Sequence, residues 1–317
     1  MSAAVVDPAA GTLQSVLHPA GWDATIISQF AWVMFAGGAL IFVAVMVLLG
    51  LSLRGHTRPL RPALWIAGAG VAFPIVVLSA LLIWSTWRSA QLAPQSSSQS
   101  LTISVTAKMW WWEVRYRDPE SGQEIVTANE IHVPVGQAVY LGLNAADVIH
   151  SLWVPALAGK RDMIPGRVTG LTLRADKPGV YRGQCAEYCG AQHARMALQV
   201  IALPPEEFKA WLARQAQPAL APDTALLERG RTVFLEQRCQ SCHTIRGVSN
   251  TARLGPDLTH VGSRMQIGAG VLRTHQGTLA GWIADPQAVK PGVFMPAASG
   301  IDGESLRALA AYLAHLK

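Results

Sequence analysis

Two long apolar segments constrain the fold of this chain more than any other feature. The first covers residues 26–53, interrupted only by Ser28, Gln29 and Ser52, and the second covers residues 63–87. A helix needs about 20 apolar residues to cross the hydrocarbon core of a bilayer, and both segments exceed that length. They therefore predict two membrane-spanning helices. The alternative, a buried helical hairpin in a soluble protein, fits these lengths less well.

The distribution of arginines predicts which side of the membrane each part faces. The loop at residues 54–62 holds Arg54, Arg58 and Arg61, a basic cluster between the two spans. Short loops rich in Lys and Arg remain in the cytoplasm. We therefore expect the N-terminus and everything after Trp87 to lie outside, with the two spans serving as an anchor.

Composition agrees with an anchored protein and argues against a nucleic-acid-binding one. Half of the residues are hydrophobic and only 15% are charged. The net charge is +6, but the basic residues are spread along the chain and form no nucleic-acid-binding patch. Residues 1–25 contain no Lys or Arg, so the positively charged start of a secretory signal peptide is missing. We expect this lead-in to be loosely structured or to form a short helix before the first span.

Beyond a polar hinge at residues 91–100, the sequence changes to short runs rich in β-branched and aromatic residues. Breaks at Asp118-Pro119, Pro134 and Gly166 separate many of these runs. Such spacing predicts an antiparallel barrel or sandwich of roughly 100 residues. The predicted strands are residues 101–105, 110–116, 130–133, 138–143, 169–174, 179–184 and 197–202.

The rest of the chain is expected to form a small all-α domain. A helix that starts with prolines is predicted at residues 203–214, and an Ala/Pro tether follows at 217–223. Amphipathic segments are then predicted at 224–237 and 303–316, with long loops between them. So small a domain would be only marginally stable without an additional link, such as a disulfide or a bound cofactor. The predicted parts are a lead-in (1–25), a transmembrane hairpin (26–90), a β-barrel domain (91–204), a helix and linker (205–222) and a helical domain (223–317).

One loop in the β region carries a dense set of soft metal ligands. Cys185, Cys189, His193 and Met196 lie within a dozen residues. Thiolate, imidazole and thioether ligands favour copper over hard cations, and the Cys-x-x-x-Cys spacing differs from that of zinc knuckles and thioredoxin-type pairs. A blue-copper site needs one thiolate, so the second Cys provides sulfur for a second metal ion. The alternative reading of the cysteine pairs is two local disulfides.

A distant histidine completes this set. His150 stands between two apolar strand-like segments, about 35 residues before Cys185. With two bridging thiolates, one imidazole on each copper ion would give each metal a trigonal core. Taken alone, His150 could equally be a buried core histidine, but the neighbouring ligand loop favours ligation.

The helical domain contains the covalent attachment signature of a c-type haem, Cys239-Gln-Ser-Cys242-His243. The two thiols can add to the vinyl groups, and the adjacent His can serve as the proximal iron ligand. A redox dithiol is the alternative, but no βαβ pattern surrounds the motif.

The distal iron ligand must come from Met295, Met265, His260 or His275. We favour Met295, because flanking prolines stiffen its loop and can hold a thioether against the iron. Met265 is the main competitor, although a Met in a flexible loop is more often a packing residue.

Four segments resemble subunit II of haem–copper oxygen reductases: residues 150–155, 162–167, 183–190 and 193–196. The resemblance covers roughly residues 20–215 and implies a cupredoxin-like barrel with a mixed-valence dinuclear copper centre, CuA. It implies bridging ligands Cys185 and Cys189, terminal ligands His150 and His193, and axial ligands Met196 and the Glu187 carbonyl. It also implies that the Glu187 side chain helps to bind magnesium at the contact with the large catalytic subunit.

The tryptophans 110–112 lie where this family has an aromatic run, and the resemblance makes Trp110 the residue that receives electrons from a cytochrome. Strand alternation places Trp110 and Trp112 on one face and Trp111 on the other. The sequence departs from the family at Lys108-Met109, which replaces a common His-Gln. It also has Pro62 where many relatives carry a Glu that assists proton uptake, so no proton route is predicted.

Residues 223–317 resemble class I cytochrome c domains, so the whole chain resembles subunit II of a caa-type cytochrome c oxidase. This implies that an external donor reduces the haem, and that electrons pass through copper to a separate oxygen-reducing subunit I. The expected location is the bacterial inner membrane with both cofactor domains outside. Two alternatives remain: the electron-entry subunit of a CuA-type nitric oxide reductase, and a membrane-tethered copper or haem carrier.

Overall fold

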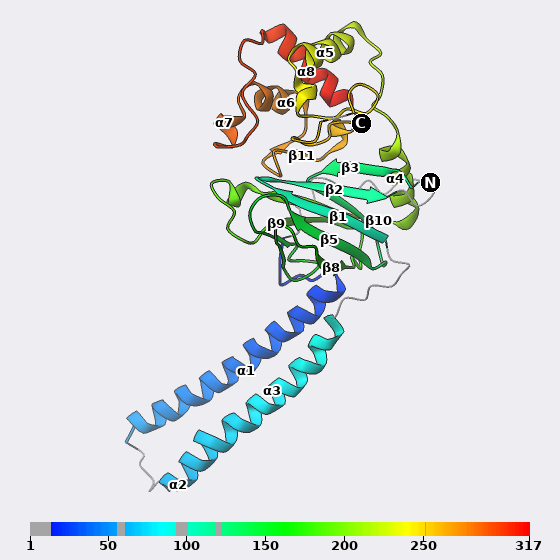
Figure 1. Cartoon of the computed structure of the whole chain (residues 1–317). Helices are drawn as coiled ribbons and strands as arrows, with labels where there is room; N and C mark the ends of the chain where they lie inside the picture. The colour runs from blue at the N-terminus through cyan, green and yellow to red at the C-terminus, as the bar shows by residue number, and fades with distance from the viewer. Residues whose placement is uncertain (1–13, 56–60, 93–100, 118–121, 251) are drawn as a thin grey trace. The chain divides into compact units, whose positions relative to one another are not determined.

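The computed structural model describes residues 14–55, 61–92, 101–117, 122–250 and 252–317 and divides into two compact units (Figure 1). The smaller unit is Asp23–Pro94, and the larger comprises Met1–Trp22 and Gln95–Lys317. Several predicted features lie wholly or largely outside the described residues: the first half of the lead-in, the middle of the arginine loop, the hinge at 91–100 and the break at Asp118-Pro119.

The smaller unit consists of two apolar helices that are long enough to cross a membrane. Helix α1 is Trp22–Leu53, so it begins four residues earlier than the predicted span. The second helix runs through α2 (Pro62–Leu64), a π-helical stretch (Trp65–Ala72) and α3 (Phe73–Ser89), and ends in a 3₁₀ turn (Ala90–Leu92).

Pro74 explains why the second helix is widened in its first half. A proline within a helix has no N–H to donate, and its ring clashes with the carbonyl four residues earlier. The helix relaxes by forming i→i−5 bonds, among them the bond from Phe73 N–H to Gly68 O. The two predicted spans therefore have the expected length and apolar character. The difference from the prediction is that the first half of the second helix is π-helical.

In the larger unit, the β region forms a sandwich of two five-stranded sheets with a cupredoxin-like fold. The first sheet has the order β3 (Glu124–Ala128), β2 (Trp111–Arg117), β1 (Leu101–Lys108), β5 (Val139–Ala145), β8 (Thr169–Leu173). The second has the order β4 (Glu130–Pro134), β10 (Ala197–Leu203), β9 (Gly179–Cys185), β6 (His150–Trp153), β7 (Arg161–Met163).

The prediction of a purely antiparallel sheet is wrong at two pairs of strands. β1 pairs with β5 in parallel, and β10 pairs with β4 in parallel. Each parallel pair joins strands that are distant in sequence. Hydrophobic alternation shows which residues of a strand face the core, but it does not show in which direction the neighbouring strand runs. Strands β3, β6 and β7 were also not predicted, and β6 and β7, with four and three residues, are too short to show a clear period.

Strand β4 is buried along its whole length. One face contributes Ile131 and Val133 to the core, while His132 on the other face stacks on Trp211 of helix α4 (Pro205–Ala216) with ring centroids 3.9 Å apart. Although β4 is the edge strand of its sheet, helix α4 covers the face that does not meet the core, so neither face is exposed. Helix α4 was correctly placed by the sequence, including its proline start.

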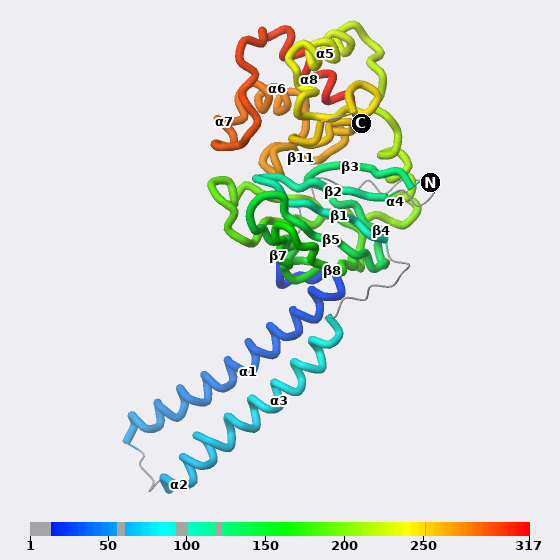
Figure 2. Tube along the Cα trace, viewed as in Figure 1, coloured from blue at the N-terminus to red at the C-terminus, as the bar shows by residue number. Residues whose placement is uncertain are grey.

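The helical part comprises α5 (Ala225–Glu236), α6 (Gln276–Ala284), α7 (Pro286–Val289) and α8 (Gly303–His315). The chain path from β10 through α4 into these helices can be followed in Figure 2. Helices α5 and α8 cross closely at Gly230, where a Cβ would lie 2.2 Å from the Ala308 carbonyl oxygen. The predicted pair of amphipathic helices is confirmed, and α6 and α7 lie in what the sequence showed only as loop.

Candidate copper and haem sites

The copper-ligand loop connects the end of β9 to the start of β10. Cys185 is the last residue of β9, and its N–H donates to the Met196 carbonyl across the base of the loop at 2.9 Å. The next N–H, from Ala186, donates to Ser151 O of the neighbouring strand β6 at 2.9 Å. These bonds hold the loop beside the first residue of β6, which is His150.

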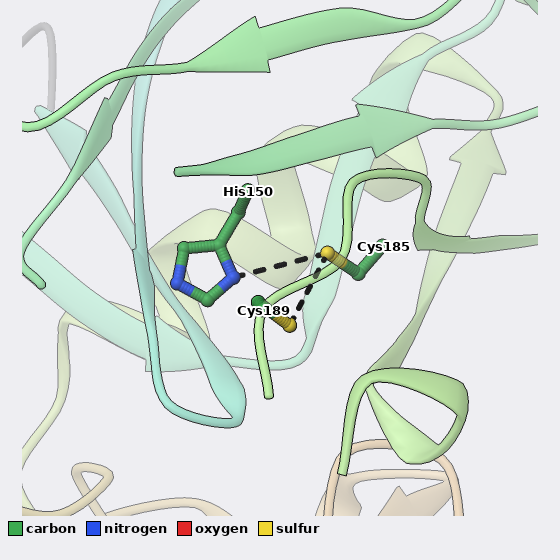
Figure 3. Close-up of side chains that lie close together, drawn as sticks. All are labelled: His150, Cys185 and Cys189. Atoms are coloured by element: carbon green, nitrogen blue, oxygen red, sulfur yellow. Dashed lines mark hydrogen bonds between the residues drawn. The ribbon is translucent and has the colours of Figure 1, made fainter. Parts of the chain in front are cut away.

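The side chains of His150, Cys185 and Cys189 converge on one point (Figure 3). The Sγ atoms of Cys185 and Cys189 lie 3.7 Å apart. His150 Nδ1 lies 3.8 Å from Cys185 Sγ, and His193 Nδ1 lies 3.6 Å from Cys189 Sγ. Each sulfur therefore has one imidazole of its own.

Each sulfur also has one weaker ligand candidate. The Glu187 carbonyl oxygen lies 3.2 Å from Cys185 Sγ, and Met196 Sδ lies 3.9 Å from Cys189 Sγ. The structure therefore brings together all six residues that the sequence singled out for copper. His150 and Met196 are almost fully buried, which fixes their orientation before a metal binds.

The two thiols cannot both ionise easily without a cation. A hydrogen bond from Cys189 lowers the pKa of the Cys185 thiol, although burial opposes this shift. The neighbouring Cys185 sulfur raises the pKa of Cys189. A second thiolate becomes stable only beside positive charge, which is the condition that a bound metal ion supplies.

Asp147 orients the His150 ring, and sequence reasoning missed it. Its Oδ1 lies 2.8 Å from His150 Nε2, which leaves Nδ1 to face the sulfur, and its Oδ2 accepts from Met109 N–H at 2.7 Å. A carboxylate behind a ligating imidazole is the usual partner of a metal-bound His. The Asp-x-x-His spacing was the available signal.

Trp110 lies in the turn before β2 and is only 8% exposed. Its indole N–H donates to the Cys189 carbonyl at 2.7 Å, so it touches the copper loop directly. Trp112 is fully buried and Trp111 is half-buried, in agreement with the predicted alternation of faces.

The haem-attachment motif forms a tight turn in which His243 N–H donates to the Cys239 carbonyl at 3.0 Å. His243 Nδ1 lies 2.8 Å from the Pro256 carbonyl oxygen, which leaves Nε2 as the iron ligand. A Cβ at Gly255 would lie 2.5 Å from the His243 ring, so the chain passes close behind the imidazole. These residues fit a covalently attached haem with His243 as the proximal ligand.

The candidate distal ligands differ in their surroundings. Met295 and Cys239 pack against the same hydrophobic core cluster of the helical part. Both ring nitrogens of His260 already lie near carbonyl oxygens, of Lys317 and Gln217, at 3.1 Å. His275 caps helix α6 through its side chain. These contacts favour Met295 over the two histidines, and Met265 remains the alternative.

Replacing Gly255 by Ala is expected to displace His243 and lower the thermal stability of the haem domain. Forcing an extra methyl group into such a contact costs about 1–3 kcal/mol. Thermal unfolding and the haem absorption spectrum would measure both effects. Gly281→Ala is the matched control, because its Cβ would meet nothing within 4 Å on helix α6 and should stabilise slightly. Equal melting temperatures for Gly255→Ala and the native chain would contradict the prediction.

Comparison with known proteins finds a match for each of the two domains that carry these sites. A family model for the periplasmic domain of cytochrome c oxidase subunit II matches residues 119–203, and one for cytochrome c matches residues 227–317. The cytochrome c oxidase subunit 2 of Alkalihalophilus pseudofirmus is 38% identical over 245 residues, covering 77% of this chain and 70% of that protein. The chain belongs to the cytochrome c oxidase subunit 2 family.

Two further subunit 2 proteins of this name are similar over most of the chain. The one from Bacillus sp. PS3 is 32% identical over 259 residues, covering 77% of this chain and 71% of that protein. The one from Bacillus subtilis is 29% identical over 305 residues, covering 88% and 84%. With a copper-binding and a cytochrome c domain on one chain, this member is a subunit II of the caa type, an electron-transfer part of an oxidoreductase complex.

Proposed function

We propose that the ligand loop and His150 hold two copper ions, as a CuA centre. The observation that carries this proposal is the order of the ligand atoms: imidazole, sulfur, sulfur, imidazole, with successive separations of 3.8, 3.7 and 3.6 Å. One copper ion would use only part of this set, whereas two ions sharing both sulfurs use all of it. The Glu187 carbonyl and Met196 then serve as the weak axial ligands.

The haem c is attached through Cys239 and Cys242, with His243 and Met295 as its axial ligands. Met/His ligation gives a haem of relatively high potential, suited to accepting electrons from a respiratory donor. The chain's own part is to hold the two cofactors in fixed surroundings. His243 is oriented by the Pro256 carbonyl, and the copper ligands are oriented by Asp147 and the loop hydrogen bonds.

In this function, electrons enter from an external cytochrome c or a quinol-oxidising complex, reach the haem, pass to copper beside Trp110, and leave to subunit I. Oxygen is reduced on that partner. With the arginine loop in the cytoplasm, both cofactor domains would lie on the outer side of a bacterial inner membrane. The oxidase relatives do not favour the nitric oxide reductase or the carrier alternative.

Glu187 is the proposed link to subunit I through a shared magnesium ion. Its carbonyl faces Cys185, while its side chain is 43% exposed and lies 3.4 Å from Lys160 Nζ. An exposed ion pair of this kind contributes little stability, so the carboxylate is free to exchange its Lys160 partner for a hard cation.

The proposal predicts a definite stoichiometry for the purified oxidase complex. Metal analysis should find two copper ions and one haem iron per copy of this chain in addition to the metals of the partner subunits, with a near-infrared copper band and rapid electron transfer from haem to copper. Exchangeable, redox-silent copper would instead identify a metal carrier. A large subunit that turns over nitric oxide but not oxygen would identify the reductase.

A further inference from the structure

The loop that carries Met295 is bonded directly to the loop that carries the copper ligands. Gln192 Nε2 donates to the Pro291 carbonyl at 2.6 Å. Three residues further along the copper loop, Arg195 Nη1 donates to the Val289 carbonyl at 2.5 Å. The segment from Val289 to Met295 is therefore attached at its start to residues that flank His193.

Lys290 lies at the centre of this contact. It is only 2% exposed, and its Nζ donates to the Trp110 carbonyl at 2.8 Å and the Gly268 carbonyl at 2.9 Å. Burial lowers the pKa of Lys290 to about 7, with the Cys189 sulfur opposing the shift. A buried amine is tolerated only when its donors are satisfied, so these two carbonyls and Lys290 depend on one another.

Aromatic side chains continue the contact towards the haem ligand. The Phe294 ring stacks on the Trp110 ring with centroids 6.1 Å apart and planes 23° apart. Trp110 in turn donates its indole N–H to the Cys189 carbonyl. Because Phe294 is the covalent neighbour of Met295, an unbroken series of contacts runs from one ligand loop to the other.

A second set of contacts fixes the same two domains together. The Ala197 N–H donates to the Ala269 carbonyl at 2.9 Å, and Met265 N–H donates to the buried Glu130 carboxylate at 2.6 Å. A Cβ at Gly270 would lie 2.8 Å from the Ala197 Cβ, so the backbones approach closely here. The haem domain is therefore held at two separate places and cannot pivot about one of them.

We propose that Lys290 and Phe294 are positioning residues that hold the Met295 loop on Trp110 and so form an internal electron route from the haem domain to Cys189. This rests on the proposed function. It adds that Trp110 is covered by this chain's own haem domain and is not a landing site for a soluble donor. With both cofactors bound, one electron leaves ferrous haem and one enters the copper centre, and no bond or proton changes place.

The test measures the rate of haem-to-copper electron transfer after flash photoreduction, in the complete oxidase with both cofactors bound. Phe294→Ala should slow this step about tenfold, as expected when a reacting pair is slightly displaced. Phe294 is 73% exposed, so its truncation leaves the fold intact. Leu226→Ala, an exposed apolar truncation on α5 of the same domain, is the matched control and should leave the rate unchanged.

Lys290→Met gives a second readout that does not depend on electron transfer. It should speed hydrogen exchange at the backbone amides of residues 266–270 and 108–112, and it should also slow electron transfer from haem to copper. The control is Lys209→Met, which removes an exposed ion pair and should change neither the exchange nor the transfer rate. Transfer rates within twofold of the native rate in both Phe294→Ala and Lys290→Met, with intact haem and copper spectra, would overturn the inference and leave the proposed function standing. Absence of haem-to-copper transfer in the native oxidase would overturn the proposed function itself.

Discussion

Replacing Cys189 by Ser is expected to remove the copper centre and oxidase turnover while leaving the haem in place. Cys189 Sγ lies near three candidate ligand atoms: Cys185 Sγ at 3.7 Å, His193 Nδ1 at 3.6 Å and Met196 Sδ at 3.9 Å. A serine hydroxyl is a harder donor that does not ionise at neutral pH, so it cannot share two copper ions. We expect a loss of turnover of about 100-fold or more, because even the residues behind a ligand contribute 10–100-fold.

Copper content per haem and oxygen consumption would be measured on the same preparation of the complex. Tyr188→Phe is the matched control, since this neighbour lies in the same loop and is 77% exposed. The haem spectrum provides an internal check that the variant has folded. A native copper content per haem and full turnover in Cys189→Ser would show that Cys189 does not bridge the metals.

The ligands of this site could be predicted from the sequence because most of them are local. Five of the six lie from Cys185 to Met196, and a short loop closed by the bond from Cys185 N–H to Met196 O must bring them together. His150 was found by its residue type and by resemblance, but its strand β6, which pairs antiparallel with β7 and β9, was not predicted. The types of ligand residue can be read from a short stretch of sequence. The pairing of distant strands cannot, because hydrophobic alternation shows only which face of a strand is buried.

The residues that support the sites were mostly missed for a different physical reason. Asp147 and Lys290 are ordinary charged residues in loops, where sequence patterns predict exposure. Their importance comes from contacts over long sequence separations, such as the bond from Lys290 Nζ to the Trp110 carbonyl. Trp110 was identified as an aromatic residue at the right place, but its covering by Phe294 depends on how two separately folded parts meet.

The predicted domain boundaries depend on composition and remain predictions, whereas the kinds of fold are confirmed. Apolar length predicted the helices of the smaller unit, and alternation predicted most strands of the sandwich. The helical domain was the hardest part, since α6 and α7 are short and lie between glycine-rich and proline-rich turns. A haem-binding domain of this size takes much of its stability from its covalent cofactor, so its loops carry only weak helical patterns.

Replacing Met295 by His is expected to convert the haem from Met/His to bis-His ligation and lower its reduction potential. A thioether stabilises the reduced iron relative to an imidazole, and axial ligands shift haem potentials by on the order of 100 mV or more. Since 59 mV is a tenfold change for one electron, a shift of about 100 mV should make reduction by the external donor about 50-fold less favourable. Spectroelectrochemical titration of the haem would measure the shift, with the optical spectrum reporting the ligand change.

Met265→Leu is the control for Met295→His, because a Leu conserves most of the volume and usually costs less than about 1.5 kcal/mol. The Met265 backbone N–H, which donates to Glu130, is retained in that variant. Its haem spectrum and potential should match those of the native chain. An altered spectrum in Met265→Leu together with an unchanged one in Met295→His would transfer the distal-ligand role to Met265, and the Phe294–Trp110 contact would then lie next to a loop that does not ligate iron.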